Sequence, residues 1–373
     1  MAARRIILKD CDFFTVAANN KVSVQSKKRK MKGKKMVLLS GLFLVMEGAS
    51  GQSILQQYFN GNKDSMLREA TKLINLPTPV FSSVNPVMPE TEKVQPYKST
   101  DFYFNARDHK KLYARKFAKT SRNTIILIHG VGTDGFFYIK TAGMLRAATG
   151  AEVYAIDLRG HGKSAGANGD VDYIGQYADD VEDLVKVIRQ KKPRGKVIVA
   201  GHSMGGGVAL QYALQRQAAN IDGFILFAPL IGQNSPAIRM PQTPGKDTTE
   251  PFMQIAFARI IGLKMLNELN NHSQDSLPVL FLNLPVNARG RVYTYRANMS
   301  STPEEYLTGL KALDKPTLVL TGTADEVFDA DLLKKAFNEH SKAEVHLITG
   351  ASHNGVRVDP SAFDHIKKWF VAL

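Results

Sequence analysis

The sequence predicts an α/β fold in which a mainly parallel sheet is covered by helices on both faces. Short apolar runs at residues 124–128, 152–156, 196–200, 224–227, 317–320 and 344–348 have the length and composition of strands buried on both sides. Helical patterns separate them, most clearly over residues 173–190, where apolar residues recur at three- and four-residue steps. Buried strands that alternate with amphipathic helices are typical of parallel sheets.

Other segments complete the expected domain. Residues 101–105 and 111–117 flank a turn and predict an antiparallel hairpin at one edge of the sheet. Helices are expected over residues 204–216, 331–340 and 363–372. The alternation pauses between residues 228 and 313, which predicts a cap inserted at about residues 230–300. Residues 52–100 contain five prolines and are interpreted as a connector before the main domain at residues 101–373.

Composition limits the classes of function. The chain of 373 residues is 44% apolar, enough for a large buried core and unlike a disordered protein. Its net charge of +15 would be consistent with nucleic-acid binding if it were spread over the whole chain. However, +8 of it falls within residues 1–51. The rest of the chain is only mildly basic, so we expect no nucleic-acid partner.

Residues 31–52 have the layout of a secretory signal peptide. Lys32, Lys34 and Lys35 precede a ten-residue apolar run from Val37 to Met46, and small residues follow. We expect translation to start at Met31, cleavage near Ser50-Gln52, and a periplasmic or secreted protein. An uncleaved membrane anchor and a short buried helix are the alternatives, although ten apolar residues are short for a bilayer.

Cysteine chemistry is excluded for the mature protein. Cys11 is the only cysteine and precedes the expected cleavage site. Neither a disulfide nor a cysteine nucleophile can then form. No cluster of metal-ligand type is visible either, so we expect no metal and no organic cofactor.

The strongest motif is Gly201-His202-Ser203-Met204-Gly205. It lies between a predicted strand and a predicted helix, the context of a nucleophile elbow, in which a sharp turn exposes the serine hydroxyl at the edge of the sheet. The motif alone is only moderately specific, and a glycine-rich turn is the alternative. In its context it predicts Ser203 as a catalytic nucleophile.

A serine nucleophile needs a base and an orienting acid, in the chain order Ser, acid, His for this arrangement. His353 follows the last predicted strand directly and is the expected base. Asp325 follows the preceding strand and is the expected acid, with Glu326 and Asp329 as alternatives. Each follows a parallel strand, so all three should meet at one edge of the sheet.

The intermediate of acyl transfer also needs hydrogen-bond donors for its oxyanion. The N–H of Met204 follows the nucleophile directly and is one expected donor. The other is the N–H of Val131, within His129-Gly130-Val131-Gly132 after an earlier strand.

These motifs, with Asp157-Leu158-Arg159-Gly160-His161-Gly162-Lys163-Ser164 and Ser352-His353, resemble the α/β-hydrolase superfamily over about residues 100–370. Within it the chain is similar to the monoacylglycerol lipase, lysophospholipase and serine aminopeptidase-like group. The resemblance implies the α/β-hydrolase fold, with a mostly parallel central sheet and an inserted cap. It also implies structural roles for Arg159 and His161 in a loop that shapes the site.

The sequence therefore predicts a serine carboxylic ester hydrolase acting through an acyl-enzyme on Ser203. The resemblance implies a lipid-like ester as the substrate and leaves room for peripheral membrane contact. Peptide, lactone or carbon–carbon bond hydrolysis, acyl transfer, and non-catalytic ligand binding remain alternatives. Apolar cap residues either line an acyl pocket or form the core of the cap: Phe252, Met253, Ile255, Phe257, Ile260, Ile261, Met265 and Leu266.

Overall fold

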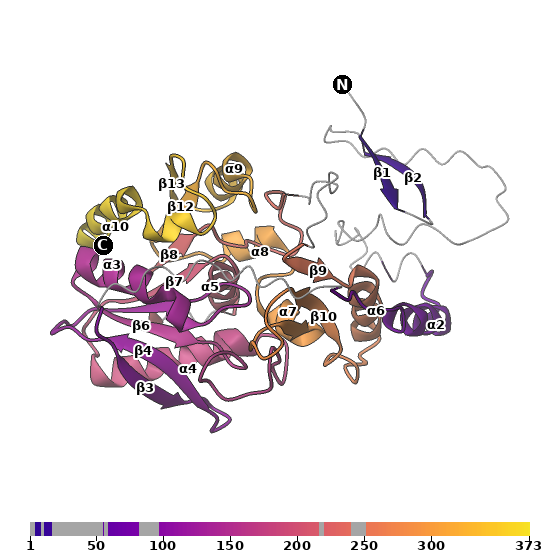
Figure 1. Cartoon of the computed structure of the whole chain (residues 1–373), viewed down its shortest axis with the longest axis horizontal. Coiled ribbons are helices and arrows are strands. Elements are labelled where there is room, and N and C mark those ends of the chain that lie inside the picture. The colour runs from indigo at the N-terminus through magenta and orange to yellow at the C-terminus, as the bar shows by residue number, and fades with distance from the viewer. Residues whose placement is uncertain are drawn as a thin grey trace.

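The computed structural model describes residues 4–8, 11–16, 55, 59–81, 97–215, 220–239 and 251–373. Its centre is an eight-stranded sheet in the order β13-β12-β8-β7-β5-β6-β4-β3 (Figure 1). The strands are β3 (Thr100–Asn105), β4 (Lys111–Phe117), β5 (Thr124–Ile128), β6 (Glu152–Asp157), β7 (Val197–His202), β8 (Gly223–Phe227), β12 (Thr317–Gly322) and β13 (Glu344–Ile348). The predicted α/β fold is confirmed.

The pairing of the strands follows the expected pattern. The six strands from β13 to β6 pair in parallel. β3 and β4 form the predicted antiparallel hairpin, and β4 also pairs antiparallel with β6. The central strands β5, β7 and β8 are buried at every position, which explains their continuous apolar runs.

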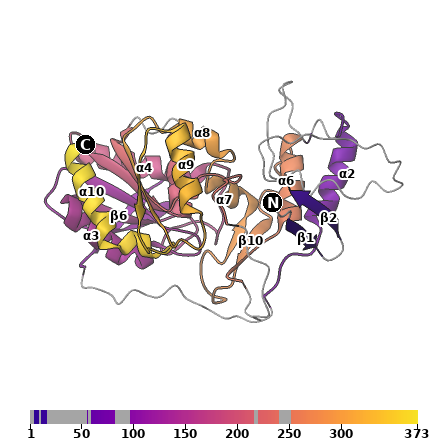
Figure 2. The same ribbon diagram turned by 90° about the horizontal axis from the view of Figure 1, so that it is seen from above.

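Helices cover both faces of this sheet (Figure 2). One face carries α3 (Ile139–Thr149) and α10 (Pro360–Ala372), whose apolar residues share a core with the strands. The other carries α4 (Gln176–Lys191), α5 (Met204–Leu214) and α9 (Ala330–His340). The sheet is therefore the middle of three layers, and its loops at one end remain available for a site.

The inserted segment between β8 and β12 has a small sheet of its own. Three strands in the order β11-β10-β9 are β9 (Met253–Ile255), β10 (Pro278–Leu282) and β11 (Val292–Thr294). The helices are α6 (Phe257–Glu268), α7 (Tyr295–Ser300) and α8 (Tyr306–Lys311). The sequence pattern predicts no strands here, because two of them are only three residues long and none is buried along its whole length.

Helix α2 (Lys63–Ile74), within the expected connector, lies beside α6 of the insertion (Figures 1 and 2). The side chain of Asn62 caps it by accepting the N–H of Ser65 at 2.9 Å. Its buried residues Met66, Ala70 and Ile74 join α6 in a separate apolar cluster. Part of the segment interpreted as a connector is therefore a structural element of the cap.

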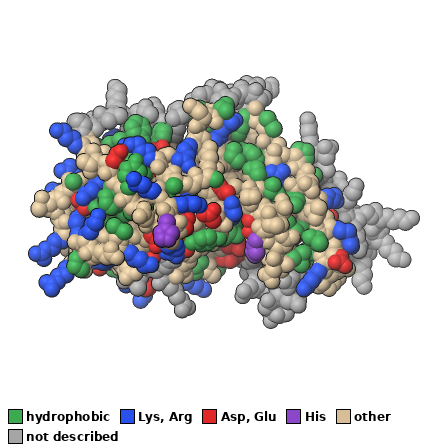
Figure 3. Space-filling view, turned by 90° about the horizontal axis from the view of Figure 1, so that it is seen from below, with side chains coloured by type: hydrophobic (Ala, Val, Ile, Leu, Met, Phe, Trp, Pro, Cys, Tyr) green, Lys and Arg blue, Asp and Glu red, His purple; other side chains and the backbone are tan. Residues whose placement is uncertain are grey.

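The N-terminal region is described only in part. β1 (Arg4–Leu8) and β2 (Cys11–Val16) pair antiparallel as a two-stranded sheet. The expected signal segment, residues 31–52, with its start and cleavage sites, lies outside the described residues. Among the helices that are described, none is long and apolar enough to cross a membrane. Figure 3 shows one face, on which Lys and Arg side chains are scattered.

Candidate active site

Four loops that follow parallel strands of the main sheet carry the predicted site residues. Val131 follows β5, Ser203 follows β7, Asp325 follows β12 and His353 follows β13. Because the carboxyl ends of parallel strands open at the same edge of a sheet, the topology brings these loops to one end of the molecule.

Ser203 lies at a strained turn between β7 and α5. Its backbone has φ 54° and ψ −118°, a conformation that costs a non-glycine residue on the order of 1–3 kcal/mol. A Cβ at Gly201 would collide with the backbone of Gly205, and one at Gly205 would collide with the Ile128 carbonyl. The N–H of Ser203 donates to the carbonyl of Phe227 at 3.0 Å. These contacts hold the predicted elbow.

His353 and Asp325 are hydrogen-bonded to each other. Nδ1 of His353 lies 2.9 Å from Oδ2 of Asp325, and both side chains are buried. The other carboxylate oxygen of Asp325 accepts the N–H groups of Val327 and Phe328, each at 2.8 Å. The ring of Phe328 packs edge-on against that of His353. With Nδ1 donating to the carboxylate, Nε2 of His353 is left as the basic nitrogen.

The two alternative acids, Glu326 and Asp329, accept backbone N–H groups. Glu326 accepts the backbone N–H of His353 at 2.9 Å through Oε2. Asp329 caps α9 by accepting the N–H of Leu332 at 3.1 Å. Of the three carboxylates considered, Asp325 is the one that faces the imidazole. In the described part of the chain no three His, Cys, Asp or Glu side chains are grouped closely enough to hold a metal ion.

Two tyrosine hydroxyls hold the loop of residues 129–132 after β5, which we call the oxyanion loop. The N–H of Gly130 donates to Tyr138 Oη at 2.8 Å. The N–H of Gly132 donates to Tyr293 Oη at 2.9 Å, and Tyr293 belongs to β11 of the cap. The peptide groups on both sides of that of Val131 are therefore fixed.

The N–H groups of Val131 and Met204 remain available. Within the described residues neither donates a hydrogen bond. A Cβ at Gly130 would lie 3.5 Å from Cβ of Ser203, so the oxyanion loop runs directly beside Ser203. Two backbone N–H groups without a hydrogen-bond acceptor, close to a serine hydroxyl, are what an oxyanion hole requires.

The sequence did not predict the role of His202, a buried histidine beside the site. Nδ1 of His202 lies 2.7 Å from Tyr138 Oη, and Nε2 lies 2.9 Å from the carbonyl of His353. Tyr138 already accepts the N–H of Gly130, so its own proton points to His202, whose Nε2–H donates to that carbonyl. Burial lowers the pKa of His202 well below its usual value, so the ring is neutral.

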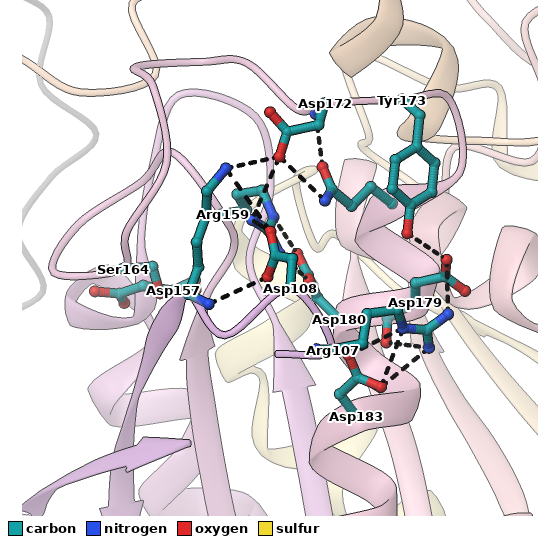
Figure 4. A network of polar contacts seen from close by, with 12 residues as sticks. Arg107, Asp108, Asp157, Arg159, Ser164, Asp172, Tyr173, Asp179, Asp180 and Asp183 are labelled. Atoms are coloured by element: carbon teal, nitrogen blue, oxygen red, sulfur yellow. Dashed lines mark hydrogen bonds and ion pairs between the residues drawn. The ribbon is translucent and has the colours of Figure 1, made fainter. Parts of the chain in front are cut away.

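The loop after β6 is held by an ion-pair network (Figure 4). The buried guanidinium of Arg159 contacts Asp180 at 2.6 Å and Asp108 at 2.6 Å. Oγ of Ser164 donates to the carbonyl of Asp157 and accepts the N–H of Tyr113. These contacts give Arg159 the structural role that the sequence suggests.

Three of the apolar cap residues considered from the sequence form the core of the cap. Ile261, Met265 and Leu266 are buried in the cluster shared with α2, so they form the core of the cap. Other cap side chains cover the oxyanion loop: a Cβ at Gly132 would lie 3.1 Å from Leu284 and 3.8 Å from Phe252, and closer still to Leu282. The part of the cap that lies against Gly132 is therefore apolar.

Comparison with known proteins places the chain in a family. Residues 119–357, more than half of the chain, match the serine aminopeptidase S33 family. The chain belongs to this family. It is thus a serine hydrolase of the α/β-hydrolase fold, and the sequence-based resemblance is confirmed at that level.

Several relatives are named as lipases. The chain is 33% identical over 141 residues to the monoacylglycerol lipase of Mycolicibacterium smegmatis, a match that covers 38% of this chain and 45% of that protein. It is 26% identical over 227 residues to phospholipase YtpA of Bacillus subtilis, covering 59% and 83%. In the first case the match spans less than half of the relative.

Solved structures support the fold alone. The α/β hydrolase GrgF from Penicillium sp. sh18 superimposes with a TM-score of 0.53 at 18% identity, covering 74% of this chain and 98% of that one. At this identity the likeness concerns the path of the backbone, and function must be argued from the site.

Proposed function

We propose that the protein hydrolyses carboxylic esters through an acyl-enzyme on Ser203. The observation that carries the proposal is the hydrogen bond from His353 Nδ1 to Asp325, which leaves Nε2 as the base at the sheet edge where Ser203 lies. Membership of a serine hydrolase family supports it.

The proposed reaction has two halves. His353 Nε2 takes the proton of Ser203 as its oxygen attacks the ester carbonyl, while Asp325 stabilises the imidazolium. The N–H groups of Val131 and Met204 bind the oxyanion. The imidazolium then gives its proton to the leaving alcohol. In the second half a water, deprotonated by His353, attacks the acyl-enzyme and releases the acid.

We infer a lipid-like ester as the substrate, of monoacylglycerol or lysophospholipid type. The apolar cap surface made by Leu282, Leu284 and Phe252 next to the oxyanion loop favours binding of a hydrocarbon chain over a polar group. The lipase names of several relatives support this inference.

The test is hydrolysis of p-nitrophenyl esters of increasing acyl length by the full chain, with Ser203→Ala and His353→Ala alongside. We expect turnover that rises with chain length, and a loss of about 10⁴-fold or more in each variant. Monoacylglycerols and lysophospholipids then identify the head group. A folded wild type that neither hydrolyses these esters nor reacts with a fluorophosphonate at Ser203 would refute the proposal.

Peptide hydrolysis is a second candidate, because the matched family is described as serine aminopeptidases. Aminoacyl p-nitroanilides offered beside the esters separate the two activities. A higher kcat/KM on the anilides would replace the ester proposal. Lactones and added alcohol acceptors test the remaining alternatives of ring opening and acyl transfer.

We also propose that the protein is exported after cleavage near Ser50-Gln52. The basic and apolar pattern of residues 31–52 supports this. Sequencing the N-terminus of the native protein is the test. A native N-terminus upstream of Met31 would refute both the proposed start and the proposed cleavage.

A further inference from the structure

The cap reaches the oxyanion loop through the hydroxyl of Tyr293, a fully buried residue of β11. Its Oη accepts the N–H of Gly132 at 2.9 Å and lies 2.7 Å from Nε2 of His161. One hydroxyl thus joins the inserted segment to two loops of the main sheet, those after β5 and after β6.

The direction of each hydrogen bond is fixed by chemistry. A backbone N–H can only donate, so Tyr293 accepts from Gly132 and points its own proton at His161. Nε2 of His161 is then unprotonated, and its Nδ1–H donates to the carbonyl of Arg159 at 2.9 Å. Burial lowers the pKa of His161 to about 3 and raises that of Tyr293, so neither group changes charge near neutral pH.

Tyr293 is carried by a hairpin that is fastened to the loop after β6. The guanidinium of Arg289 donates to three carbonyls of that loop, those of Gly162, Ser164 and Gly166, at 2.8–2.9 Å. The N–H of Gly290 in the hairpin donates to Asn168 Oδ1, and Arg296, in α7 directly after β11, pairs with Asp170 at 2.7 Å. The support of the hydroxyl is therefore held at several points.

The oxyanion loop needs such support. Gly132 has φ +69°, and glycine can change between this conformation and others at little cost in energy. The N–H of Val131 can meet an oxyanion only while the neighbouring peptide groups stay in place, and small displacements of a donor are costly in catalysis.

We propose that Tyr293 is a positioning residue that fixes the oxyanion loop, so that the cap completes the oxyanion hole as well as covering the substrate. This inference rests on the proposed ester hydrolysis. The hydroxyl touches no substrate atom. It acts by holding the peptide group of Gly132, and through it the N–H of Val131, in the orientation that the transition state requires.

The experiment compares the full chain with Tyr293→Phe, which removes one oxygen. We expect kcat on a p-nitrophenyl ester to fall roughly 10- to 100-fold with KM changed by less than about twofold, because the loss concerns the transition state. A trifluoromethyl ketone, whose serine adduct carries an oxyanion, should bind Tyr293→Phe more weakly by a similar factor.

Tyr295→Phe is the matched control. Tyr295 is also a buried cap tyrosine, but it packs in the cluster shared by α2 and α6, away from the oxyanion loop. We expect wild-type kcat and inhibitor affinity for this variant. Equal losses in the two variants would overturn the inference, since they would reflect a general weakening of the cap. Wild-type kcat and inhibitor affinity in Tyr293→Phe would also overturn it.

Arg289→Met removes contacts that hold the hairpin carrying Tyr293, so it tests the same inference. It also replaces Tyr293→Phe as the test if that variant does not fold. This variant should lower kcat by less than Tyr293→Phe does, with KM retained. An unchanged kcat would contradict the inference that the hairpin holds the Tyr293 hydroxyl in place. A wild type without esterase activity or fluorophosphonate labelling would instead refute the proposed function, which distinguishes the two failures.

Discussion

At the scale of single residues, the carboxylate of Asp325 divides its two oxygens between different partners. One accepts two backbone N–H groups of its own loop, and the other faces Nδ1 of His353. The first contact fixes the side chain, so the second is presented to the imidazole in one orientation. This division makes the consequence of an amide replacement predictable.

In Asp325→Asn the carbonyl oxygen of the amide keeps the two backbone bonds and the NH₂ group faces His353. Nδ1 must then accept, the proton moves to Nε2, and the imidazole can no longer take the proton of Ser203. We expect kcat to fall about 10⁴-fold with the fold intact. Steady-state kinetics at neutral pH measures this.

Glu326→Gln is the control, because the carboxylate of Glu326 accepts the backbone N–H of His353 and a glutamine oxygen can still accept it. We expect less than about a tenfold loss. If Glu326→Gln were the more damaging of the two, Glu326 and not Asp325 would be the orienting acid.

The sequence offers candidates for the reactive residues but not for the residues that hold them in place. Ser203, Asp325 and His353 could be proposed because each follows a recognisable strand in a fixed chain order. Tyr138 and Tyr293 could not, since their contacts with the oxyanion loop depend on tertiary packing, in the second case across 161 positions. A tyrosine that donates to a buried histidine leaves no local pattern in the chain.

At the scale of elements, the contact between α2 and α6 depends on a glycine. A Cβ at Gly262 would lie 2.8 Å from the carbonyl oxygen of Ala70 and 3.0 Å from Cβ of Leu73. The two helices therefore approach more closely than side chains would allow. Arg259 adds hydrogen bonds from α6 to the carbonyls of Ile74 and Pro278, each at 3.0 Å.

Gly262→Leu should separate α2 from α6. We expect a loss of about 1–3 kcal/mol from overpacking, confined to this helix pair. Hydrogen exchange of the α2 amides should accelerate while that of β5 and β7 is unchanged. Leu67→Ala, on the exposed side of α2, should change neither. Equal exchange in α2 of the wild type and Gly262→Leu would show that the helices do not depend on this contact.

Elements buried on both faces were predictable, and elements of the cap were not. Strands such as β5 and β7 are apolar at nearly every position because helices cover both sides. β10 is only partly buried and β9 and β11 are three residues long, too short for any period to show. Helix α2 was missed because the whole of residues 52–100 was interpreted from its five prolines, whereas the helix occupies a proline-free stretch before the first of them, Pro77.

At the scale of the whole molecule, three buried neutral histidines make the free energy of unfolding decrease as the pH falls. Burial lowers the pKa of His129 to about 4, of His161 to about 3, and of His202 well below its usual value. Once unfolded, each binds a proton below about pH 6.5. The unfolded state then holds more protons than the folded one, so stability falls as the pH falls below about 6.5.

Two buried carboxylates act in the opposite direction. Burial raises the pKa values of Asp157 and Asp180 to about 6, so the folded state retains protons that the unfolded state releases above about pH 4. These two carboxylates offset part of the acid dependence that the three histidines cause, and stability still falls as the pH falls below about 6.5.

Urea unfolding at several pH values measures this dependence. We expect the unfolding free energy to be nearly constant from pH 8 to about 7 and to decline below about pH 6.5. His109→Gln, which alters an exposed loop histidine, should leave the slope unchanged. An unfolding free energy that did not fall between pH 7 and 5 would contradict the assignment of the three rings as neutral.

The docking of α2 on α6 also bears on how the enzyme can be shortened for use as a reagent. A protein shortened to begin at residue 97 would keep the whole main sheet but lose α2, which would expose the apolar side of α6 that Met66, Ala70 and Ile74 cover. An uncovered apolar stripe invites self-association in storage and at the concentrations of a preparative reaction. A shortened form of the enzyme should therefore retain α2.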